Sequence, residues 1–325
     1  MSKPAKADLK RVIAITGTSG FVGESLLATL RQRFKNFRLI AIDKQPPKIK
    51  LTGKNKFYQV DLTAPHTDQT LIDIFNKENC DTLIHAAVLT QPPRDLDASH
   101  ELQSVGTMYL VNAAAATDVR KLILVSTTDV YGAFPDNPNF LTEDHPTRGK
   151  KLSPFLKDKI DVEEQFIGFA KKYPDRVTTL LRLATIVGPT VHNFKTNFFQ
   201  NAIIPSVLGF DPLIQFVHES DVIRAFVKVI QENHPGIFNI VGEGVLPLSR
   251  ATHLAGKITL PIPSPILYPA AELLWVMDVG PAPSGHVNFL KYLCVADGTK
   301  AQKQIGFQPV YSSQEALMSF LAKEK

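Results

Sequence analysis

The 325-residue sequence is poor in cysteine, in long apolar runs and in clustered charge. Its two cysteines, Cys80 and Cys294, lie far apart and outside any C-x-x-C pattern, which indicates two reduced packing residues rather than a disulfide framework. No apolar run approaches the roughly 18 residues of a membrane span, and residues 1–10 lack the apolar core of a signal peptide. The net charge of +5 forms no basic stripe interleaved with aromatic residues, so nucleic acid is not an expected partner. These absences predict a globular protein of the cytoplasm without a membrane span.

Three spaced glycines follow an apolar run near the start of the chain. Residues 12–16 are typical of a buried parallel strand, and Gly17, Gly20 and Gly23 follow in a G-x-x-G-x-x-G pattern. Residues 24–34 then carry an apolar helical stripe. A strand, a glycine turn and a helix N-terminus in this order present backbone N–H groups to a pyrophosphate. The pattern therefore predicts a dinucleotide site.

A carboxylate closes the second predicted strand, residues 38–43. Asp43 lies twenty residues beyond Gly23, where a carboxylate accepts hydrogen bonds from the adenosine ribose hydroxyls and repels a 2′-phosphate. This favours NAD over NADP, although Lys44 and Lys48 lie close enough to leave NADP open. The alternative is an aspartate that caps a turn at the strand end.

Strand-like and helix-like segments alternate through the first half of the chain, which is typical of a doubly wound parallel sheet. The next segments are predicted strands at 57–60, 81–87, 121–126 and 178–187 and predicted helices at about 69–79 and 99–116.

Polar and small residues follow two of these strands. Asp61 is placed to meet an adenine amino group, and Ala86 and Ala87 leave space beside a cofactor. An ordinary strand-end aspartate and plain tight packing are equally good interpretations of these residues. His85 has no second ligand at metal-site spacing, so it is interpreted as a satisfied polar residue, and no metal site is predicted.

Seven short motifs occur in one order along almost the whole chain. They are T-G-T-S-G-F-V-G at 16–23, D-L at 61–62, H-A-A at 85–87, V-G-T at 105–107, S-T-T-D-V-Y-G at 126–132, V-G-P at 187–189 and F-V-H-E-S-D-V at 216–222. With these motifs the chain resembles an extended short-chain dehydrogenase/reductase of the NAD-dependent epimerase/dehydratase family. The resemblance implies an α/β fold, with a seven-stranded Rossmann-type doubly wound parallel sheet and a smaller C-terminal substrate-facing domain.

The resemblance also implies domain boundaries and a cofactor site. After a flexible N-terminus at 1–10, an NAD(P)-binding domain covers 11–189 with return segments at about 214–242, and a substrate-facing domain covers 190–213 and 243–325. The implied cofactor contacts are Gly17, Thr18, Ser19, Gly20, Phe21, Val22, Gly23, Asp43, Asp61, Leu62, Ala86, Ala87 and Lys159.

The family transfers protons with a Ser or Thr, a Tyr, a Lys one helical turn later and an Asn. Thr127 matches the first position. A helix is expected to begin with Ser153 as N-cap and Pro154 at the first helical position. Lys159 then takes the lysine position on the face of the residue four before it.

Two members of this set differ from the family. The tyrosine position holds Phe155 and the asparagine position holds Gln103. A benzyl ring carries no exchangeable proton, and loss of positioned general acid/base catalysis costs roughly 10²–10⁴ in rate. Phe155 is therefore interpreted as a packing residue beside the nicotinamide.

Other residues are candidates for the substrate side. Asp129 aligns with an acidic residue that dehydratases of the family use, so it is either a general base or a carboxylate buried against a turn. His192 either faces the substrate cleft or is a solvated loop residue, while Thr128 and Asn197 match substrate positions.

The substrate side lacks two arginines that nucleotide-sugar epimerases of the family use to clamp a diphosphate. Ile214 and Val287 stand at those places, so the expected small-molecule substrate is not a UDP-sugar. The Pro-rich and apolar segment 260–279 either walls an apolar pocket or forms a core helix or a dimer contact.

Three hypotheses of function, from two classes, remain open. The leading prediction is an NAD-linked epimerase, dehydratase or reductase with Thr127, Lys159 and Asp129 as its remaining polar groups. The alternative is a non-catalytic NAD(P)-binding sensor or scaffold, and a third hypothesis is a conventional sugar epimerase whose proton comes from elsewhere. Family analogy predicts a homodimer that pairs through helices 99–116 and 153–172.

Overall fold

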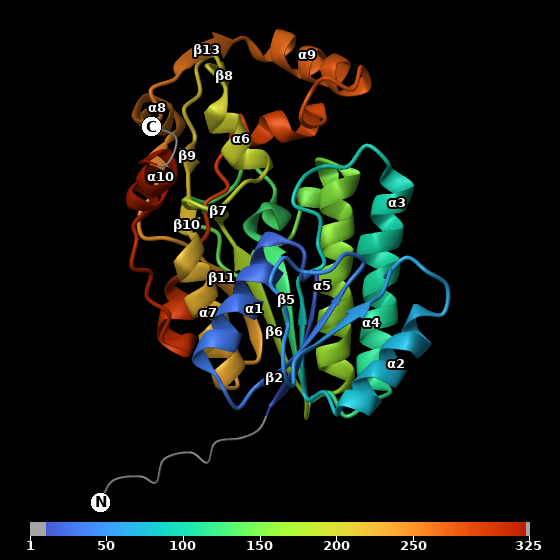
Figure 1. Ribbon diagram of the computed structural model, residues 1–325. Coiled ribbons are helices and arrows are strands. Elements are labelled where there is room, and N and C mark those ends of the chain that lie inside the picture. The colour runs from blue at the N-terminus through green and yellow to red at the C-terminus, as the bar shows by residue number, and fades with distance from the viewer. Residues whose placement is uncertain (1–10, 323–325) are drawn as a thin grey trace, which may run out of the picture.

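The structure is a computed structural model that describes residues 11–322. Its centre is a seven-stranded parallel sheet with the order β11-β6-β5-β4-β1-β2-β3 (Figure 1). The strands are β1 (Val12–Thr16), β2 (Arg38–Asp43), β3 (Lys56–Gln59), β4 (Thr82–His85), β5 (Lys121–Thr127), β6 (Val177–Leu183) and β11 (Gly236–Ile240). The predicted α/β fold with a parallel seven-stranded sheet is confirmed.

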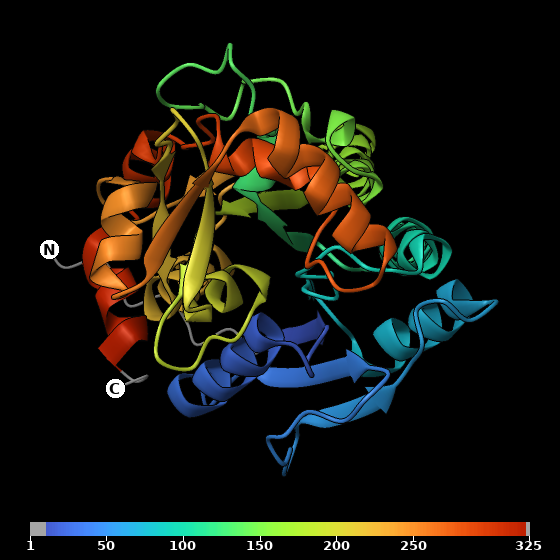
Figure 2. The ribbon, with the colours of Figure 1, turned by 90° about the horizontal axis from the view of Figure 1, so that it is seen from above.

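Helices cover both faces of this sheet (Figures 1 and 2). Helices α1 (Phe21–Arg33) and α7 (Glu219–Gln231) pack on one face, where their leucine, valine and phenylalanine side chains share one apolar cluster with the sheet. Helices α2 (Thr67–Glu78), α4 (Gly106–Ala115) and α5 (Pro154–Lys172) share a second cluster on the other face. Burial on both faces explains why the strands read as nearly continuous apolar runs.

The predicted helices at 69–79 and 153–172 are confirmed as α2 and α5. Residues 99–116 are helical too, but the helix begins earlier and has three parts. These are α3 (Leu96–His100), the π-helical turn η1 (Glu101–Val105) and α4. The wide turn buries Gln103 fully, and it brings that side chain to the Lys159 region described below.

The prediction of one strand over 178–187 is wrong. The strand breaks at Ala184, whose N–H donates to the Ile240 carbonyl at 3.0 Å. Strand β6 belongs to the main sheet, whereas β7 (Thr185–Val187) pairs with β10 (Phe216–His218). The apolar run continues across the break, which is why the sequence pattern does not reveal it.

Most of the rest of the chain forms an upper lobe over the carboxyl edge of the sheet (Figure 1). It holds two small strand pairs, β8 (Ile203–Val207) with β13 (Ile258–Ile262) and β9 (Leu213–Ile214) with β12 (Leu246–Pro247). Its helices are α6 (Phe194–Gln200), α8 (Leu248–Leu254), α9 (Ser264–Val276), the 3-10 helix η4 (Ser284–Leu290) and α10 (Ser313–Ala322). The π-turn η5 (Ala301–Ile305), which precedes α10, packs instead in the apolar cluster that contains α7 and β11. The exact division into two domains stays a prediction, and the flexible N-terminus predicted at 1–10 lies outside the described residues.

Helix α9 spans the top of the molecule (Figure 2). The core-helix interpretation of segment 260–279 is wrong, because Leu267 is the one buried residue of α9, while Leu273 and Val276 are 60% and 75% exposed. Within residues 11–322, no helix combines the length and the apolar content that crossing a membrane requires.

A single arginine fastens the end of α9 to the loop that follows β4. The Arg94 guanidinium lies 3.6 Å from the centre of the Trp275 ring and forms an ion pair with Asp278 at 2.8 Å. It also donates to the carbonyl oxygens of Trp275 and Gly280. This clamp connects the upper lobe to the sheet domain beside the candidate site.

Candidate functional site

Two glycines of the turn between β1 and α1 leave no room for a side chain. Gly17 has a φ of +72°, and a Cβ there would lie 2.4 Å from the Ala86 carbonyl group. A Cβ on Gly23 would lie 2.2 Å from the Gly17 carbonyl oxygen, so α1 approaches the turn as closely as a backbone can. The first turn of α1 has no side-chain cap at Gly20, and the buried Thr18 hydroxyl has no hydrogen-bond partner within the described residues. These features fit a pyrophosphate that would accept hydrogen bonds from the turn.

Two carboxylates lie at the ends of the neighbouring strands. The Ser19 N–H and hydroxyl both donate to Asp43 at 2.9 Å, which orients this carboxylate toward the glycine turn. Lys44 forms an ion pair with Asp61 at 2.8 Å instead of lying against Asp43. Hydrogen bonds from Lys44 and then from Thr63 lower the pKa of Asp61 to about 2, so it is ionised at neutral pH.

The start of α5 matches its prediction in detail. The Ser153 hydroxyl accepts a hydrogen bond from the Leu156 N–H at 3.3 Å, and Pro154 occupies the first helical turn. This cap sets the register that buries Phe155 and turns Lys159 toward it. The Lys159 ammonium lies 4.8 Å from the centre of the Phe155 ring and donates to the Leu89 carbonyl oxygen at 2.7 Å. Burial lowers the pKa of Lys159 to about 8, against the opposing attraction of Asp129, Glu163 and Asp158.

Gln103 and Lys159 share one small cavity at the carboxyl end of β5. Val88, Gln103, Leu124, Val125, Ser126, Lys159 and Val162 line it. The Gln103 amide nitrogen donates to the Ser99 hydroxyl at 3.1 Å, whereas its buried carbonyl oxygen has no partner among residues 11–322. Thr127 accepts a hydrogen bond from the Asp129 N–H at 3.2 Å and so caps the 3-10 turn η2 (Thr128–Tyr131).

Tyr131 does not take the place of the missing phenol. Its buried hydroxyl donates to Asn239 at 2.8 Å and accepts from Arg182 at 2.9 Å. Arg182 in turn forms a buried ion pair with Glu163 at 2.6 Å. Burial raises the pKa of Tyr131 to about 12, so this phenol is a structural group under the site.

Asp129 meets a lysine of the upper lobe. The Lys195 ammonium lies 2.7 Å from the Asp129 carboxylate and 3.1 Å from the Thr185 hydroxyl. Asp129 is partly exposed, and it lies in a turn that begins directly after β5. The geometry thus joins a candidate base of the sheet domain to a cation of α6.

Comparison with known proteins identifies the family. Residues 13–241 match the profile of the NAD dependent epimerase/dehydratase family, which is more than half of the chain. The chain belongs to this family. An uncharacterised protein of Mycobacterium tuberculosis is 30% identical over 312 residues, covering 94% of this chain and 82% of that protein. The dTDP-D-glucose 4,6-dehydratase of Homo sapiens is 26% identical over 259 residues, covering 71% of this chain and 69% of that protein.

Solved structures of other members have the same fold. The UDP-glucose 4-epimerase of Thermotoga maritima with UDP-glucose superposes with a TM-score of 0.74 at 19% identity, covering 96% of this chain and 98% of that chain. The dTDP-glucose 4,6-dehydratase DesIV of Streptomyces venezuelae with NAD and TYD reaches a TM-score of 0.75 at 18% identity, covering 96% of each chain. The predicted resemblance to the extended short-chain dehydrogenase/reductases is confirmed.

Within this family member, the other predicted residues occupy varied environments. His192 and Asn197 are exposed, whereas Thr128 is buried in the turn after β5. At the two arginine positions, Ile214 is half-buried and Val287 is buried in an apolar cluster. The described residues therefore carry no guanidinium at either place.

His85 is a satisfied core residue, as predicted. Its two ring nitrogens contact the hydroxyls of Thr16 at 2.7 Å and Thr107 at 3.0 Å, and its ring stacks on Phe166. Complete burial lowers its pKa to about 4. Of the two thiols, which are both free, Cys80 is buried and Cys294 contacts the Thr128 carbonyl oxygen at 3.6 Å.

Sequence reasoning missed two residues of the site, Lys195 and His286. Lys195 stands two positions before Asn197, a signal that was available in the sequence. His286 stands next to Val287 in η4 and belongs to no motif. Its imidazole reaches the site only because the upper lobe folds back over α5, as the contacts below show.

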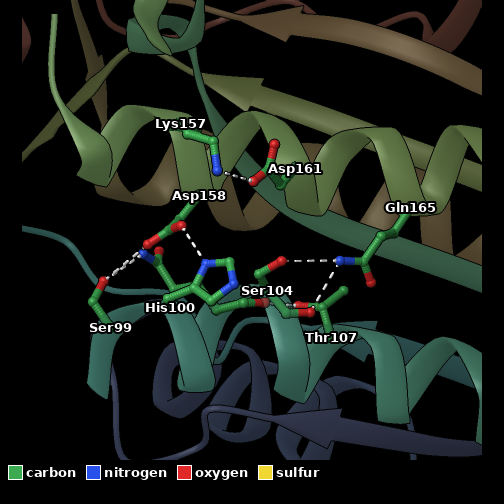
Figure 3. A network of polar contacts seen from close by, with 9 residues as sticks. Ser99, His100, Ser104, Thr107, Lys157, Asp158, Asp161 and Gln165 are labelled. Atoms are coloured by element: carbon green, nitrogen blue, oxygen red, sulfur yellow. Dashed lines mark hydrogen bonds and ion pairs between the residues drawn. The ribbon is translucent and has the colours of Figure 1, made fainter. Parts of the chain in front are cut away.

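A polar network connects the predicted dimer helices (Figure 3). His100 lies 2.9 Å from Asp158, Lys157 forms an ion pair with Asp161 at 3.3 Å, and the Gln165 amide donates to the Ser104 carbonyl oxygen. The ligand atoms of His100, Asp158 and Asp161 lie within 4.8 Å of one another. All three side chains already have partners in the protein, so the network serves to hold α3 and η1 against α5.

Proposed function

We propose that this family member binds a nicotinamide dinucleotide, NAD in preference to NADP, and exchanges hydride at a hydroxyl- or keto-bearing carbon. The observation that carries this function is the glycine turn, where Gly17 and Gly23 leave no room for a side chain and the buried Thr18 hydroxyl has no partner within the described residues. Asp43, which Ser19 holds at the turn, is a candidate partner for the ribose hydroxyls. The bound dinucleotide would accept and return the hydride.

The polar groups of the chain support the chemistry around that cofactor. Lys159 would hold the nicotinamide ribose, Thr127 would orient the substrate oxygen, and Asp129 would act as a base near the substrate. Phe155 would replace the family tyrosine and Gln103 the family asparagine, which makes the protein an atypical epimerase/dehydratase. The inert ring under the Lys159 ammonium is consistent with such a replacement.

The proposed substrate is of the sugar-nucleotide type. Relatives of this chain are named as dehydratases of dTDP-D-glucose and epimerases of UDP-glucose. Ile214 and Val287 cannot clamp a diphosphate as arginines do, so the nucleotide would be held by other groups, including Asn197. The dTDP-D-glucose 4,6-dehydratase of Homo sapiens matches 71% of this chain and the UDP-glucose 4-epimerase of Yersinia enterocolitica 54%, so we place dTDP-glucose before UDP-glucose as the candidate substrate.

Turnover of named sugars tests this function. The purified protein is incubated with NAD⁺ and either dTDP-glucose or UDP-glucose, and the sugars are analysed by NMR and mass spectrometry. The expected result is a product changed at C4 or dehydrated at C4–C6, with no net consumption of NAD⁺. The function is contradicted if neither sugar changes while the protein is saturated with NAD⁺.

If the NAD⁺-saturated protein changes neither sugar, a non-catalytic sensor or scaffold is supported. The Phe155 ring, which carries no exchangeable proton, also favours this function. Such a protein would bind NAD(H), and its contacts with partners would depend on the bound form. The predicted homodimer, paired through the two helices that Figure 3 shows, is a further proposal. Light scattering after size exclusion tests it. Localisation in the cytoplasm stays a prediction.

A further inference from the structure

An imidazole of the upper lobe packs against the ring that replaces the family phenol. The His286 ring centre lies 6.4 Å from that of Phe155. The same Phe155 ring faces the Lys159 ammonium at 4.8 Å. One aromatic side chain therefore touches both the lysine of the sheet domain and a histidine of the lobe above it.

The surroundings of the His286 side chain are mainly aromatic. Phe194 and Phe289 lie 6.2 Å and 6.0 Å from its ring, so three phenylalanines enclose it. Its Nδ1 atom is buried and forms no hydrogen bond within residues 11–322. Burying a polar atom without a hydrogen bond destabilises the folded chain, so the bare Nδ1 is a feature that calls for an explanation.

Charged groups lie close enough to act on this imidazole. Burial lowers the pKa of His286 to about 4, and Lys195 adds to this effect, while Asp129 and the Pro283 carbonyl oppose it. The ring is therefore uncharged at neutral pH, which is the state that accepts a proton. The Asp129 carboxylate, paired with Lys195, is placed to stabilise the imidazolium once it forms.

A close backbone contact fixes the position of His286. A Cβ on Gly285 would lie 1.9 Å from the Leu152 carbonyl oxygen, so η4 meets the segment before α5 without any intervening side chain. Asn288 reinforces the contact by donating to the Ala133 carbonyl oxygen at 3.0 Å. The loop that presents His286 is thus held on the sheet domain from two sides.

We propose that His286 is the catalytic residue that supplies the proton transfer lost at Phe155, an inference that rests on the proposed function. The hydroxyl proton of the sugar passes to an imidazole nitrogen while the hydrogen on the same carbon leaves with its electron pair for the nicotinamide. The O–H and C–H bonds break and the carbon–oxygen double bond forms. Return of both hydrogens reverses the step, so no other oxidant is needed.

Substitutions at His286 and Phe155 test this role. Turnover is measured with dTDP-glucose and UDP-glucose as probes, and NAD⁺ affinity is measured by calorimetry. His286→Asn is expected to lower kcat by roughly 10²–10⁴, the usual contribution of a positioned acid/base, without changing NAD⁺ affinity. Adding Phe155→Tyr to this variant restores a phenol beside Lys159 and is expected to recover at least about tenfold of the loss. His145→Asn is the matched control, because His145 also has a buried nitrogen without a partner in the described chain but packs on Tyr131.

The results separate this inference from the function beneath it. If His286→Asn turns over like the wild type, the role of His286 is wrong and the proposed function stands. A loss that Phe155→Tyr does not recover, or an equal loss in His145→Asn, would assign His286 a packing role and overturn the inference. Absence of wild-type turnover with both sugars overturns the proposed function, and the inference with it.

Discussion

At the scale of single residues, burial keeps an imidazole uncharged beside the candidate cofactor site. His85 is fully buried between Thr16 and Thr107, and no charge compensates for its desolvation, so its pKa is lowered from 6.5 to about 4. The folded protein therefore binds fewer protons than the unfolded chain between these two pH values. Stability must then rise with pH across this window and fall as the pH drops from 6.5 to 4.

Replacing His85 isolates this contribution. The full shift corresponds to about 3 kcal/mol, so the wild type is expected to lose up to about that much stability between pH 6.5 and pH 4 on account of this residue. His85→Asn cannot titrate and is expected to remove that part of the pH dependence, even though it is less stable at pH 7. Urea denaturation at several pH values measures how the free energy of unfolding changes with pH in the wild type and in the variant. Equal slopes in variant and wild type would show that His85 is not the group responsible.

At the scale of elements, the clamp between Arg94 and the end of α9 is a partly exposed connection between the lobes. The Arg94 side chain is 38% exposed, and it combines a stacked ring, an ion pair and two carbonyl contacts. Each contact is modest alone, since exposed ion pairs contribute about 0–1 kcal/mol and exposed cation–π pairs about 0.5–1 kcal/mol. The end of α9 depends on their sum because its apolar side chains find little burial.

The single tryptophan of the chain reports on this clamp. Arg94→Leu removes the stack, the ion pair and both carbonyl contacts, so Trp275 is expected to become more accessible. Acrylamide quenching of the intrinsic fluorescence is expected to show a larger Stern–Volmer constant in this variant. Arg250→Leu, which removes an exposed arginine from α8, is the control and should quench like the wild type. Unchanged quenching in Arg94→Leu would mean that α9 is held by other contacts.

Local signals decide which elements are predictable from the sequence. The start of α5 follows from Ser153 and Pro154, because both act within one helical turn. The break at Ala184 and the π-turn at Glu101–Val105 do not follow, because tertiary contacts impose them on runs whose local pattern is continuous. The exposure of α9 cannot be predicted from the sequence either, since its apolar composition is typical of a core helix.

At the scale of the whole molecule, the candidate site is assembled from two parts that are distant in sequence. The glycine turn, Asp43 and Lys159 follow motifs of the sheet domain and are predictable for that reason. Lys195 and His286 come from the upper lobe, and their contacts with Asp129 and Phe155 connect residues 66 and more than 100 positions apart. No local pattern encodes such pairs, so only the folded chain brings them together.

Calorimetric titration with NAD⁺ tests the central claim, that the glycine turn of this chain holds a nicotinamide dinucleotide. The wild type is expected to bind one equivalent, with weaker binding of NADP⁺ because of Asp43. Gly17→Ala forces a Cβ to within 2.4 Å of the Ala86 carbonyl at a positive φ, and at least a tenfold loss of affinity, about 1.4 kcal/mol, is expected. Gly168→Ala, in α5 with open space around it, is the matched control and should bind like the wild type. Saturable binding that Gly17→Ala weakens is the predicted result, and a wild-type protein that binds neither dinucleotide would contradict the account.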